Sequence, residues 1–169
     1  RRRFASEAWI AGGSMAALAA SLVLFVVASP NGAGLPAELV EGHVRSLQAR
    51  HLVDVETSDR HVVKPWFNGK IDFAPPVIDL ADRGYPLAGG RLDYLENRAV
   101  AALVYRRRAH VINLFVWPGA SPPAPTFQRR EGYALIRWGR GGLTYWAVSD
   151  IDPADLAAFQ KAFAARAGL

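Results

Sequence analysis

An uncharged stretch of about 21 residues, from Ala8 to Ala28, constrains this chain more than any other feature. A helix of roughly 20 apolar residues crosses the hydrocarbon core of a bilayer, which is about 30 Å thick. Three arginines, Arg1–Arg3, precede the stretch, and basic residues prefer the cytoplasmic flank of a membrane span. The sequence therefore predicts a cytoplasmic stub at residues 1–7, a transmembrane helix at residues 8–28, and an outer domain beyond it.

A cleaved signal peptide is the alternative, because it also starts with basic residues and continues with an apolar run. The run here is longer than the usual signal core of about 7–15 residues. Its best candidate cleavage site, the small residues of Val27-Ala28-Ser29, is followed by Pro30, which is unfavourable just after a cleavage point. The sequence also begins with Arg rather than Met, so we expect a further segment on its N-terminal side. These features favour a retained anchor.

Small residues recur along the predicted span. Gly13, Ala17 and Ser21 share one helix face, and small residues at such a spacing let two membrane helices approach closely. We therefore hypothesise that the span packs against a second copy, which gives a homodimer. An alanine-rich span in an alanine-rich chain explains the same pattern without a dimer.

Composition indicates one folded domain at residues 36–169, after a breaker-rich linker at residues 29–35. Apolar residues make up 51% of the chain and charged residues 21%, which suits a packed core and not disorder. Without Arg1–Arg3 and Glu7, the 20 basic and 15 acidic residues become 17 and 14, so the domain is only mildly basic and nucleic acid is not an expected partner. The absence of cysteine excludes disulfides, a thiol nucleophile and Cys-ligated zinc from this sequence.

The N-terminal end of the domain reads as an amphipathic helix. Pro36 suits the first turn of a helix, and Val40, Val44 and Leu47 recur at helical spacing. We predict a helix over Pro36–Arg50, close enough to the membrane to transmit any movement of the domain.

The C-terminal end carries strong helix-start signals. Asp152 is a natural N-cap, Pro153 fits the first helical position, and the charge of Asp155 opposes the helix dipole. We expect the apolar face of this helix to consist of Leu156, Phe159, Ala162 and Phe163.

Between the two helices, the sequence predicts an antiparallel sheet, which gives an α+β fold. Val100–Tyr105 and Val111–Trp117 are the most apolar runs, so we place them at the centre. Glu96-Asn97 is typical of a two-residue hairpin turn, and the connections are too short for parallel crossovers. The predicted strands are Val53–Thr57, a short one near His61–Lys64, Arg91–Leu95, Arg98–Tyr105, Ala109–Trp117, Gly132–Trp138 and Leu143–Ser149.

The segment Ser58–Pro86 is rich in proline and aromatic residues, and we expect an ordered loop that lies across the sheet. Its side chains offer both large anchors and charges, as a ligand or partner surface requires. In the alternative interpretation, the aromatic residues fasten the loop to the sheet and Lys70 pairs with Asp72. The candidate binding residues are His61, Lys64, Trp66, Phe67, Lys70, Asp72 and Phe73, with His110 from the sheet.

Motifs for catalysis or metal binding do not occur in the sequence. The four histidines, His43, His51, His61 and His110, have no compact ligand spacing, and no H-E-x-x-H, G-x-S-x-G or S-x-x-K motif is present. We therefore expect no enzyme activity, no bound metal and no cofactor in this chain. A metal site assembled in three dimensions from His61, His110 and an aspartate is the less favoured alternative.

Arg106-Arg107-Arg108 lies at a predicted hairpin tip. Three adjacent arginines suit contact with anionic lipid head groups or an acidic partner. The alternative, which we favour, is a solvated turn.

Two long runs of the sequence resemble a known protein family. HVVKPWFNGKIDFAPPV occupies residues 61–77, and DLADRGYPLAGGRLDYLENRAVAALVYRRRAHVINLFVWP occupies residues 79–118. Together with the span, they resemble the extracytoplasmic part of a family of proteobacterial transmembrane anti-sigma factors, which regulate extracytoplasmic-function sigma factors. The K-P-W-F-x-G-K-x-D-F-x-P-P and Y-R-R-R-x-H-V-I-N-x-F-V-W-P patterns are long and low in degeneracy.

This resemblance implies a single-pass inner-membrane regulator with its N-terminus in the cytoplasm and its C-terminal domain in the periplasm. In the family, a cytoplasmic domain, often zinc-binding, holds the sigma factor away from RNA polymerase. Residues 1–7 are too few to form such a domain, so the sigma factor and any zinc are expected to bind a preceding segment. Two alternatives are a membrane-anchored periplasmic module that binds cell-envelope components and a membrane-tethered hydrolase.

Overall fold

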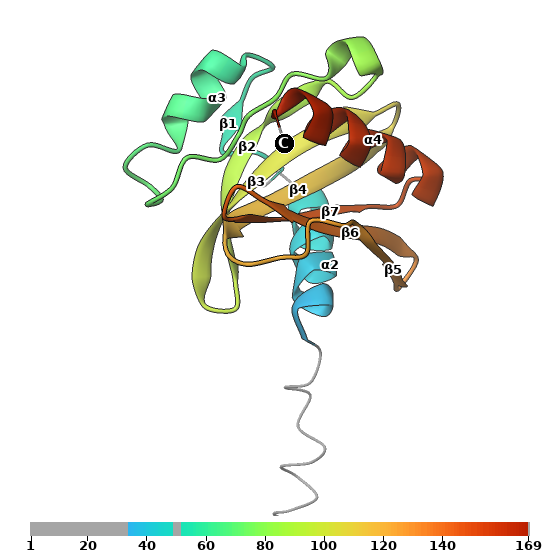
Figure 1. Cartoon of the computed structure of the whole chain (residues 1–169). Coiled ribbons are helices and arrows are strands. Elements are labelled where there is room, and N and C mark those ends of the chain that lie inside the picture. Colours follow the sequence, from blue (N-terminus) through green and yellow to red (C-terminus); the bar gives the residue numbers. More distant parts are fainter. Residues whose placement is uncertain (1–33, 49–51, 169) are drawn as a thin grey trace, which may run out of the picture. The chain divides into compact units, whose positions relative to one another are not determined.

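A seven-stranded antiparallel sheet organises the computed structural model, which describes residues 34–48 and 52–168. The strand order is β1-β2-β3-β4-β7-β6-β5, so β4 lies at the centre (Figure 1). The predicted α+β class and antiparallel sheet are confirmed. The strands are β1 (Val55–Glu56), β2 (Leu87–Leu95), β3 (Arg98–Arg107), β4 (His110–Pro118), β5 (Thr126–Arg130), β6 (Tyr133–Arg140) and β7 (Leu143–Ser149). The helices of the described residues are α2 (Gly34–Leu47), α3 (Arg60–Trp66), the 3₁₀ turn η1 (Ala81–Arg83) and α4 (Pro153–Arg166).

The predicted membrane segment lies outside the described residues. This applies to the stub at residues 1–7, the span at residues 8–28, its small-residue face of Gly13, Ala17 and Ser21, and the linker up to residue 33. Among the helices of residues 34–48 and 52–168, none combines the length and the hydropathy that a bilayer crossing needs. The anchor and the homodimer therefore stay predictions.

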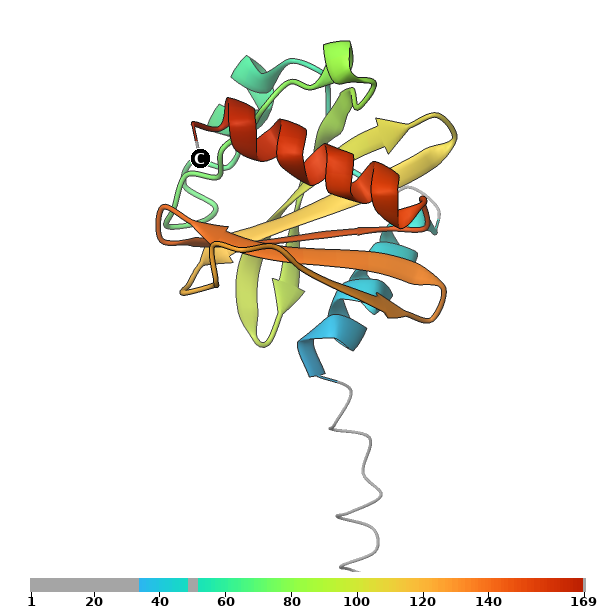
Figure 2. The ribbon, with the colours of Figure 1, turned by 45° about the vertical axis from the view of Figure 1, so that its right-hand side comes forward.

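Both faces of the sheet are covered, which places it in the middle of three layers (Figure 2). Side chains alternate between the faces, as they do in any strand. On β3, Ala101, Leu103 and Tyr105 point toward α4, whereas Val100 and Ala102 point toward α2. Each face of the sheet therefore carries its own hydrophobic core. Both cores consist of residues after Gly34, and these residues form one compact unit.

Tight turns join neighbouring strands, and the turn at Glu96-Asn97 is as the sequence predicts. Glu96 and Asn97 have φ values of 48° and 60°, which is the left-handed backbone of a type I′ hairpin. Gly141 and Gly142 form the second such turn, with φ values of 60° and 75°. A bulge interrupts the pairing of β2 with β3, because the register shifts between Leu87 and Gly89.

The predicted strand near His61–Lys64 is wrong, because these residues form helix α3. Asp59 caps the helix by accepting a hydrogen bond from the His61 backbone N–H at 2.7 Å. Val63 and Phe67, four residues apart, are both buried against the sheet. The β-branched pair at positions 62 and 63 favours a strand locally, but the cap and the burial of one helical face prevail.

Two further parts of the strand prediction need correction. The predicted Val53–Thr57 strand is shorter, because β1 comprises Val55–Glu56, although the Asp54 and Thr57 N–H groups also donate to carbonyl oxygens of β2. The sequence predicts no strand between Trp117 and Gly132, but β5 begins at Thr126 and pairs with β6. Most of β5 is exposed, so it lacks the apolar alternation by which a strand is recognised in sequence.

Helix α2 covers one face of the sheet, and of its predicted apolar positions Val40 is buried and Val44 packs against the core. The helix spans Gly34–Leu47 rather than Pro36–Arg50, and Leu47 is 47% exposed. The buried side contains polar His43 and Ser46 beside Leu39 and Val40. The spacing of apolar residues alone does not reveal that His43 and Ser46 belong to the buried side, because both are polar.

Helix α4 covers the opposite face and is as predicted. The Asp152 carboxylate accepts a hydrogen bond from the Ala154 N–H at 2.7 Å, and Pro153 occupies the first turn. Leu156, Phe159 and Phe163 are fully buried. The two phenylalanines pack edge-on against Tyr105.

Replacing Gly139 with Ala is expected to lower the free energy of unfolding by about 1–3 kcal/mol, the range for overpacking. A Cβ atom at this position would lie 2.3 Å from the carbonyl oxygen of Ser121, which is backbone and cannot rotate away. Urea unfolding of residues 34–169, followed by tryptophan fluorescence, measures the change. The matched control is Gly42→Ala in α2, where the nearest atom is 3.4 Å away and alanine favours the helix. Equal destabilisation by both variants would contradict the packing argument.

Candidate functional site

The aromatic residues predicted to bind a partner lie mostly inside the domain. Phe67 is fully buried in the core, and its ring fits against Gly90, where any Cβ atom would lie 3.0 Å from the ring. Phe73 is half-buried and packs against both cores. Trp66 is half-buried and packs edge-on against Phe67. These three side chains therefore fasten the segment after β1 to the sheet.

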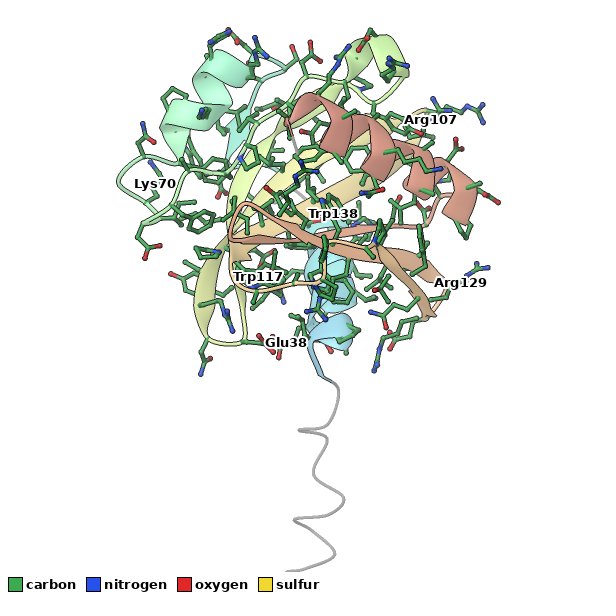
Figure 3. The ribbon with its side chains drawn as sticks, viewed as in Figure 1. Glu38, Lys70, Arg107, Trp117, Arg129 and Trp138 are labelled. Atoms are coloured by element: carbon green, nitrogen blue, oxygen red, sulfur yellow. The ribbon has the colours of Figure 1, made fainter. Side chains whose placement is uncertain are left out.

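Lys70 extends from the loop after α3 at one side of the domain (Figure 3). Its ammonium group lies 4.7 Å from the centre of the Trp66 ring, a cation–π contact. Asp72 is exposed, and the ion pairs of the described residues do not include one between Lys70 and Asp72. The predicted Lys70–Asp72 pair is thus replaced by a cation–π contact with the tryptophan.

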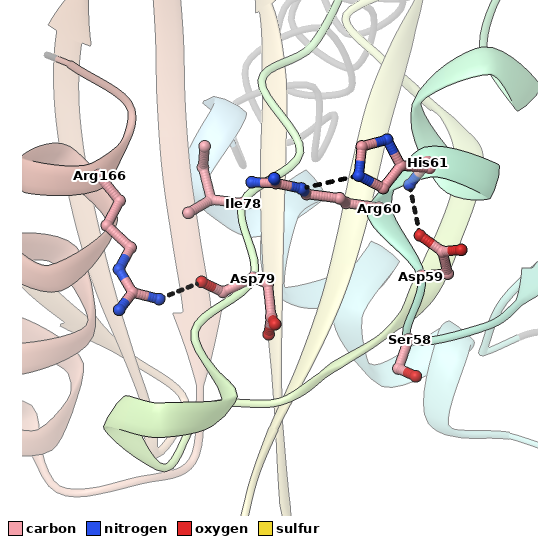
Figure 4. A pocket seen from close by; sticks show the side chains of 7 residues that line it. All are labelled: Ser58, Asp59, Arg60, His61, Ile78, Asp79 and Arg166. Carbon is pink, nitrogen blue, oxygen red and sulfur yellow. Dashed lines mark hydrogen bonds between the residues drawn. The ribbon is translucent and has the colours of Figure 1, made fainter.

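His61 and Lys64 line a groove between α3 and the C-terminal end of α4. Two adjoining cavities of about 510 and 440 Å³ share Arg60, His61, Ile78 and Arg166 in their walls. Arg60 and Arg166 approach Ile78 from opposite sides (Figure 4). We call the surface of Arg60, His61, Lys64, Ile78 and Arg166 the cationic groove.

The two cavities of the cationic groove differ in charge. The larger one also contains Ser58, Asp59 and Asp79, so it is lined by both signs. The smaller one adds Lys64, and the described residues that line it include no acidic side chain. Its remaining wall is apolar or backbone: Pro65, Pro76, Val77, Ile78 and Ala167.

Arg166 holds the two sides of the cationic groove in place. Its guanidinium donates to the Asp79 carbonyl oxygen at 2.7 Å and pairs with the Asp82 carboxylate in η1. Arg166 lowers the pKa of the Asp82 carboxyl below its usual value by hydrogen bonding to the charged form. The end of α4 is therefore tied to the loop that forms the groove floor.

His110, also predicted as a binding residue, does not line the cationic groove. It lies at the start of β4, and its Nδ1 is 2.9 Å from the Asp150 carboxylate. Within the part of the chain that the structure describes, no three His, Cys, Asp or Glu side chains are arranged to hold a metal ion. His61 and His110 are thus separate features.

A second polar cluster joins α2 to the sheet, and sequence reasoning missed it. The Asp93 carboxylate accepts hydrogen bonds from Arg91 at 3.0 Å and from Arg45 at 3.3 Å. The Arg91 guanidinium also donates to the Asn113 side chain at 3.3 Å, and Asn113 donates to the Ser46 hydroxyl at 2.9 Å. We call Arg45, Ser46, Arg91, Asp93 and Asn113 the polar network.

The two charged side chains at the centre of the polar network are buried. The side chains of Arg91 and Asp93 are only 5% and 10% exposed, whereas that of Arg45 is 61% exposed. Burial lowers the pKa of Arg91 below its usual value, and the neighbouring Asp93 charge opposes that change. The signal in the sequence is the two-residue spacing of Arg91 and Asp93, which places both on one face of a strand.

His43 lies beside the polar network on α2 and is fully buried. Its ring packs edge-on against Tyr133 with centroids 5.2 Å apart. Neither ring nitrogen has a hydrogen-bond partner among the described residues. Burial, and secondarily the Arg91 charge, lower its pKa from 6.5 to about 4, while Asp150 acts in the opposite direction. At neutral pH the imidazole is therefore uncharged.

The arginine triplet is not simply a solvated turn. Arg107 pairs with the Asp155 carboxylate of α4 at 3.1 Å and stacks over the Tyr85 ring at 4.8 Å. This middle arginine is partly buried and connects the β3–β4 hairpin to α4. Its structural role leaves fewer charges free for a lipid or partner.

Comparison with known proteins adds no relative. No protein-family model matches the sequence, and no curated protein matches it significantly. The candidate site therefore rests on the two features described above, the cationic groove and the polar network under α2.

Proposed function

We propose that this chain is the membrane anchor and extracytoplasmic sensory domain of an anti-sigma factor that restrains an extracytoplasmic-function sigma factor. In this proposal, residues 8–28 span the bacterial inner membrane and the domain after them lies in the periplasm. This proposal is supported by the resemblance of residues 61–77 and 79–118 to the anti-sigma factor family. The sigma factor would bind a cytoplasmic segment that precedes this sequence, and any zinc would belong to that segment.

The observation that carries the sensory role is the docking of α2. This helix follows the predicted span after a short linker, yet it packs into the sheet as part of the domain. Leu39 and Val40 supply apolar contacts, and Ser46 and Arg45 join the polar network. A change in the domain that alters this interface thus changes the helix nearest the membrane.

Signalling then requires two arrangements of the domain whose populations an outside event shifts. The polar network suits this task, because charged groups tolerate only a few arrangements when buried. Displacement of α2 would either act through the span directly or expose the linker to proteolysis. Both routes begin with the same interface.

The regulatory role is tested by truncation of the complete gene product. Deleting the residues from Asn31 onward should change the response of a sigma-dependent reporter, while a pull-down still recovers the sigma factor with the truncated protein. Retained binding with altered regulation assigns sensing to the outer domain and sigma binding to the cytoplasmic part. Loss of sigma binding in the truncated protein would contradict this division of labour.

The cationic groove also supports a second candidate, a periplasmic module that binds cell-envelope components without any link to transcription. The two candidates differ in what precedes Arg1 in the complete gene product. A small helical domain with clustered His and Cys residues supports the anti-sigma factor. A span preceded by only a short basic segment supports the binding module.

A further inference from the structure

The cationic groove combines two properties that favour a small ligand. It gathers Arg60, His61 and Lys64 from α3 and Arg166 from α4 around a hollow of several hundred Å³. Lys64 is exposed, and no ion pair of the described residues includes it. An unpaired cation beside a hollow attracts an anion.

Part of the groove wall is apolar. Pro65, Pro76 and Val77 line the smaller cavity, and Ile78 forms the floor that both cavities share. A ligand that contacts this wall needs an apolar group next to its charged one, since burial of apolar surface contributes to binding. The groove is therefore suited to an amphipathic molecule.

Two carboxylates beside the groove favour a ligand with one negative charge over a ligand with two. Asp59 and Asp79 lie in the wall of the larger cavity, beside Arg60 and Arg166. Each holds a local turn, because Asp59 accepts from the His61 N–H and Asp79 accepts from the Ala81 N–H. Nearby negative charge opposes a doubly charged phosphate more than a singly charged carboxylate.

The groove lies away from the helix through which the chain enters the domain. Figures 1 and 2 show the C-terminal end of α4 beside α3, with the start of α2 at the opposite end of the domain. The chain enters the domain through α2, so a molecule in the groove lies far from that entrance. We therefore choose a dissolved ligand, rather than a lipid head group, for the test.

We propose that the cationic groove binds a small, soluble, amphipathic carboxylate, with its charge at Arg60 and Lys64 and its apolar part on Val77 and Ile78. This deepens the proposed sensory function by naming the class of ligand, and its biological meaning rests on that function. Binding would bridge α3 and the loop at Val77 and Ile78, and Arg166 ties the end of α4 to the adjacent Asp79 and to Asp82.

The test uses the full chain in phosphatidylcholine nanodiscs, with empty nanodiscs as the blank, and isothermal titration calorimetry. The probe is 4-methylvalerate, a carboxylate with a branched apolar end. Its uncharged amide, 4-methylvaleramide, and the small anion acetate should each bind at least tenfold more weakly. Inorganic phosphate should also bind at least tenfold more weakly than the probe.

Two double variants locate the site. Arg60→Gln with Lys64→Gln removes an exposed arginine and lysine from the groove and should weaken 4-methylvalerate binding at least tenfold. The matched control, Arg129→Gln with Lys161→Gln, removes the same charges from exposed positions on β5 and α4 and should leave binding unchanged. Circular dichroism of each variant checks that the fold is retained.

The proposal is overturned if 4-methylvalerate does not bind at millimolar concentration, if its amide or phosphate binds equally well, or if the groove variant binds as the parent does. These results leave the anti-sigma role intact, because the truncation experiment measures regulation and not ligand binding. Conversely, ligand binding by a chain whose truncation abolishes sigma binding would retain the groove and remove the proposed function.

Discussion

Replacing Asp93 with Ala is expected to lower the free energy of unfolding by about 3–5 kcal/mol, because it leaves the buried Arg91 charge without its partner. The Arg91 side chain is only 5% exposed. Its remaining acceptors are neutral, the Leu52 carbonyl oxygen at 3.2 Å and the Asn113 side chain at 3.3 Å. Urea unfolding of residues 34–169, followed by tryptophan fluorescence, measures the loss.

Two further variants separate the causes of this loss. Arg45→Ala removes the exposed partner of Asp93 and should cost less than about 1 kcal/mol, as surface ion pairs do. Arg91→Met combined with Asp93→Leu removes both buried charges and should recover at least half of the stability lost in Asp93→Ala. If Arg45→Ala destabilises the domain as much as Asp93→Ala, the buried charge is not the cause.

Acidification from pH 7.5 to pH 5 is expected to remove about 2 kcal/mol of stability through His43 alone. The unfolded chain protonates this imidazole below about pH 6.5, whereas the folded domain, with a pKa of about 4, resists protonation. The contribution of His43 is therefore complete above pH 6.5 and is lost as the pH falls from 6.5 to 4. The difference between the two pKa values limits the total loss to about 3 kcal/mol.

The pH dependence is measured by urea unfolding at several pH values between 5 and 7.5. His43→Leu should flatten the dependence, since it removes the titrating group from a site whose ring nitrogens have no hydrogen-bond partner among the described residues. The matched control is His61→Gln, an exposed histidine in the cationic groove, which should leave the slope unchanged. An unaltered slope in His43→Leu would show that other groups govern acid stability.

Local signals predicted the parts of the fold that depend on neighbouring residues. The cap at Asp152, the turn at Glu96-Asn97 and the apolar runs of β3 and β4 each act within a few residues. Helix α3 escaped prediction because burial of Val63 and Phe67 against a distant strand overrides the β preference of its residues. Strand β5 escaped because an exposed edge strand has no apolar side to recognise.

The candidate site was harder to predict from the sequence than the fold, because its groups come from distant parts of the chain. His61 and Lys64 were predicted, but their partner across the groove, Arg166, comes from the last helical turn. Ser46 and Asn113 of the polar network are 67 positions apart. Sequence spacing reveals contacts along one helix or strand, and these contacts exist only after the sheet has formed.

The place of α2 in the chain has a consequence for the order of folding. The helix is synthesised before every strand, yet it packs on Phe115 of β4, Leu135 of β6 and Trp146 of β7. Closing such long loops is entropically costly until the sheet exists, so we infer that α2 joins late in folding. A regulator that responds to the docking of this helix therefore responds to whether the whole domain has finished folding.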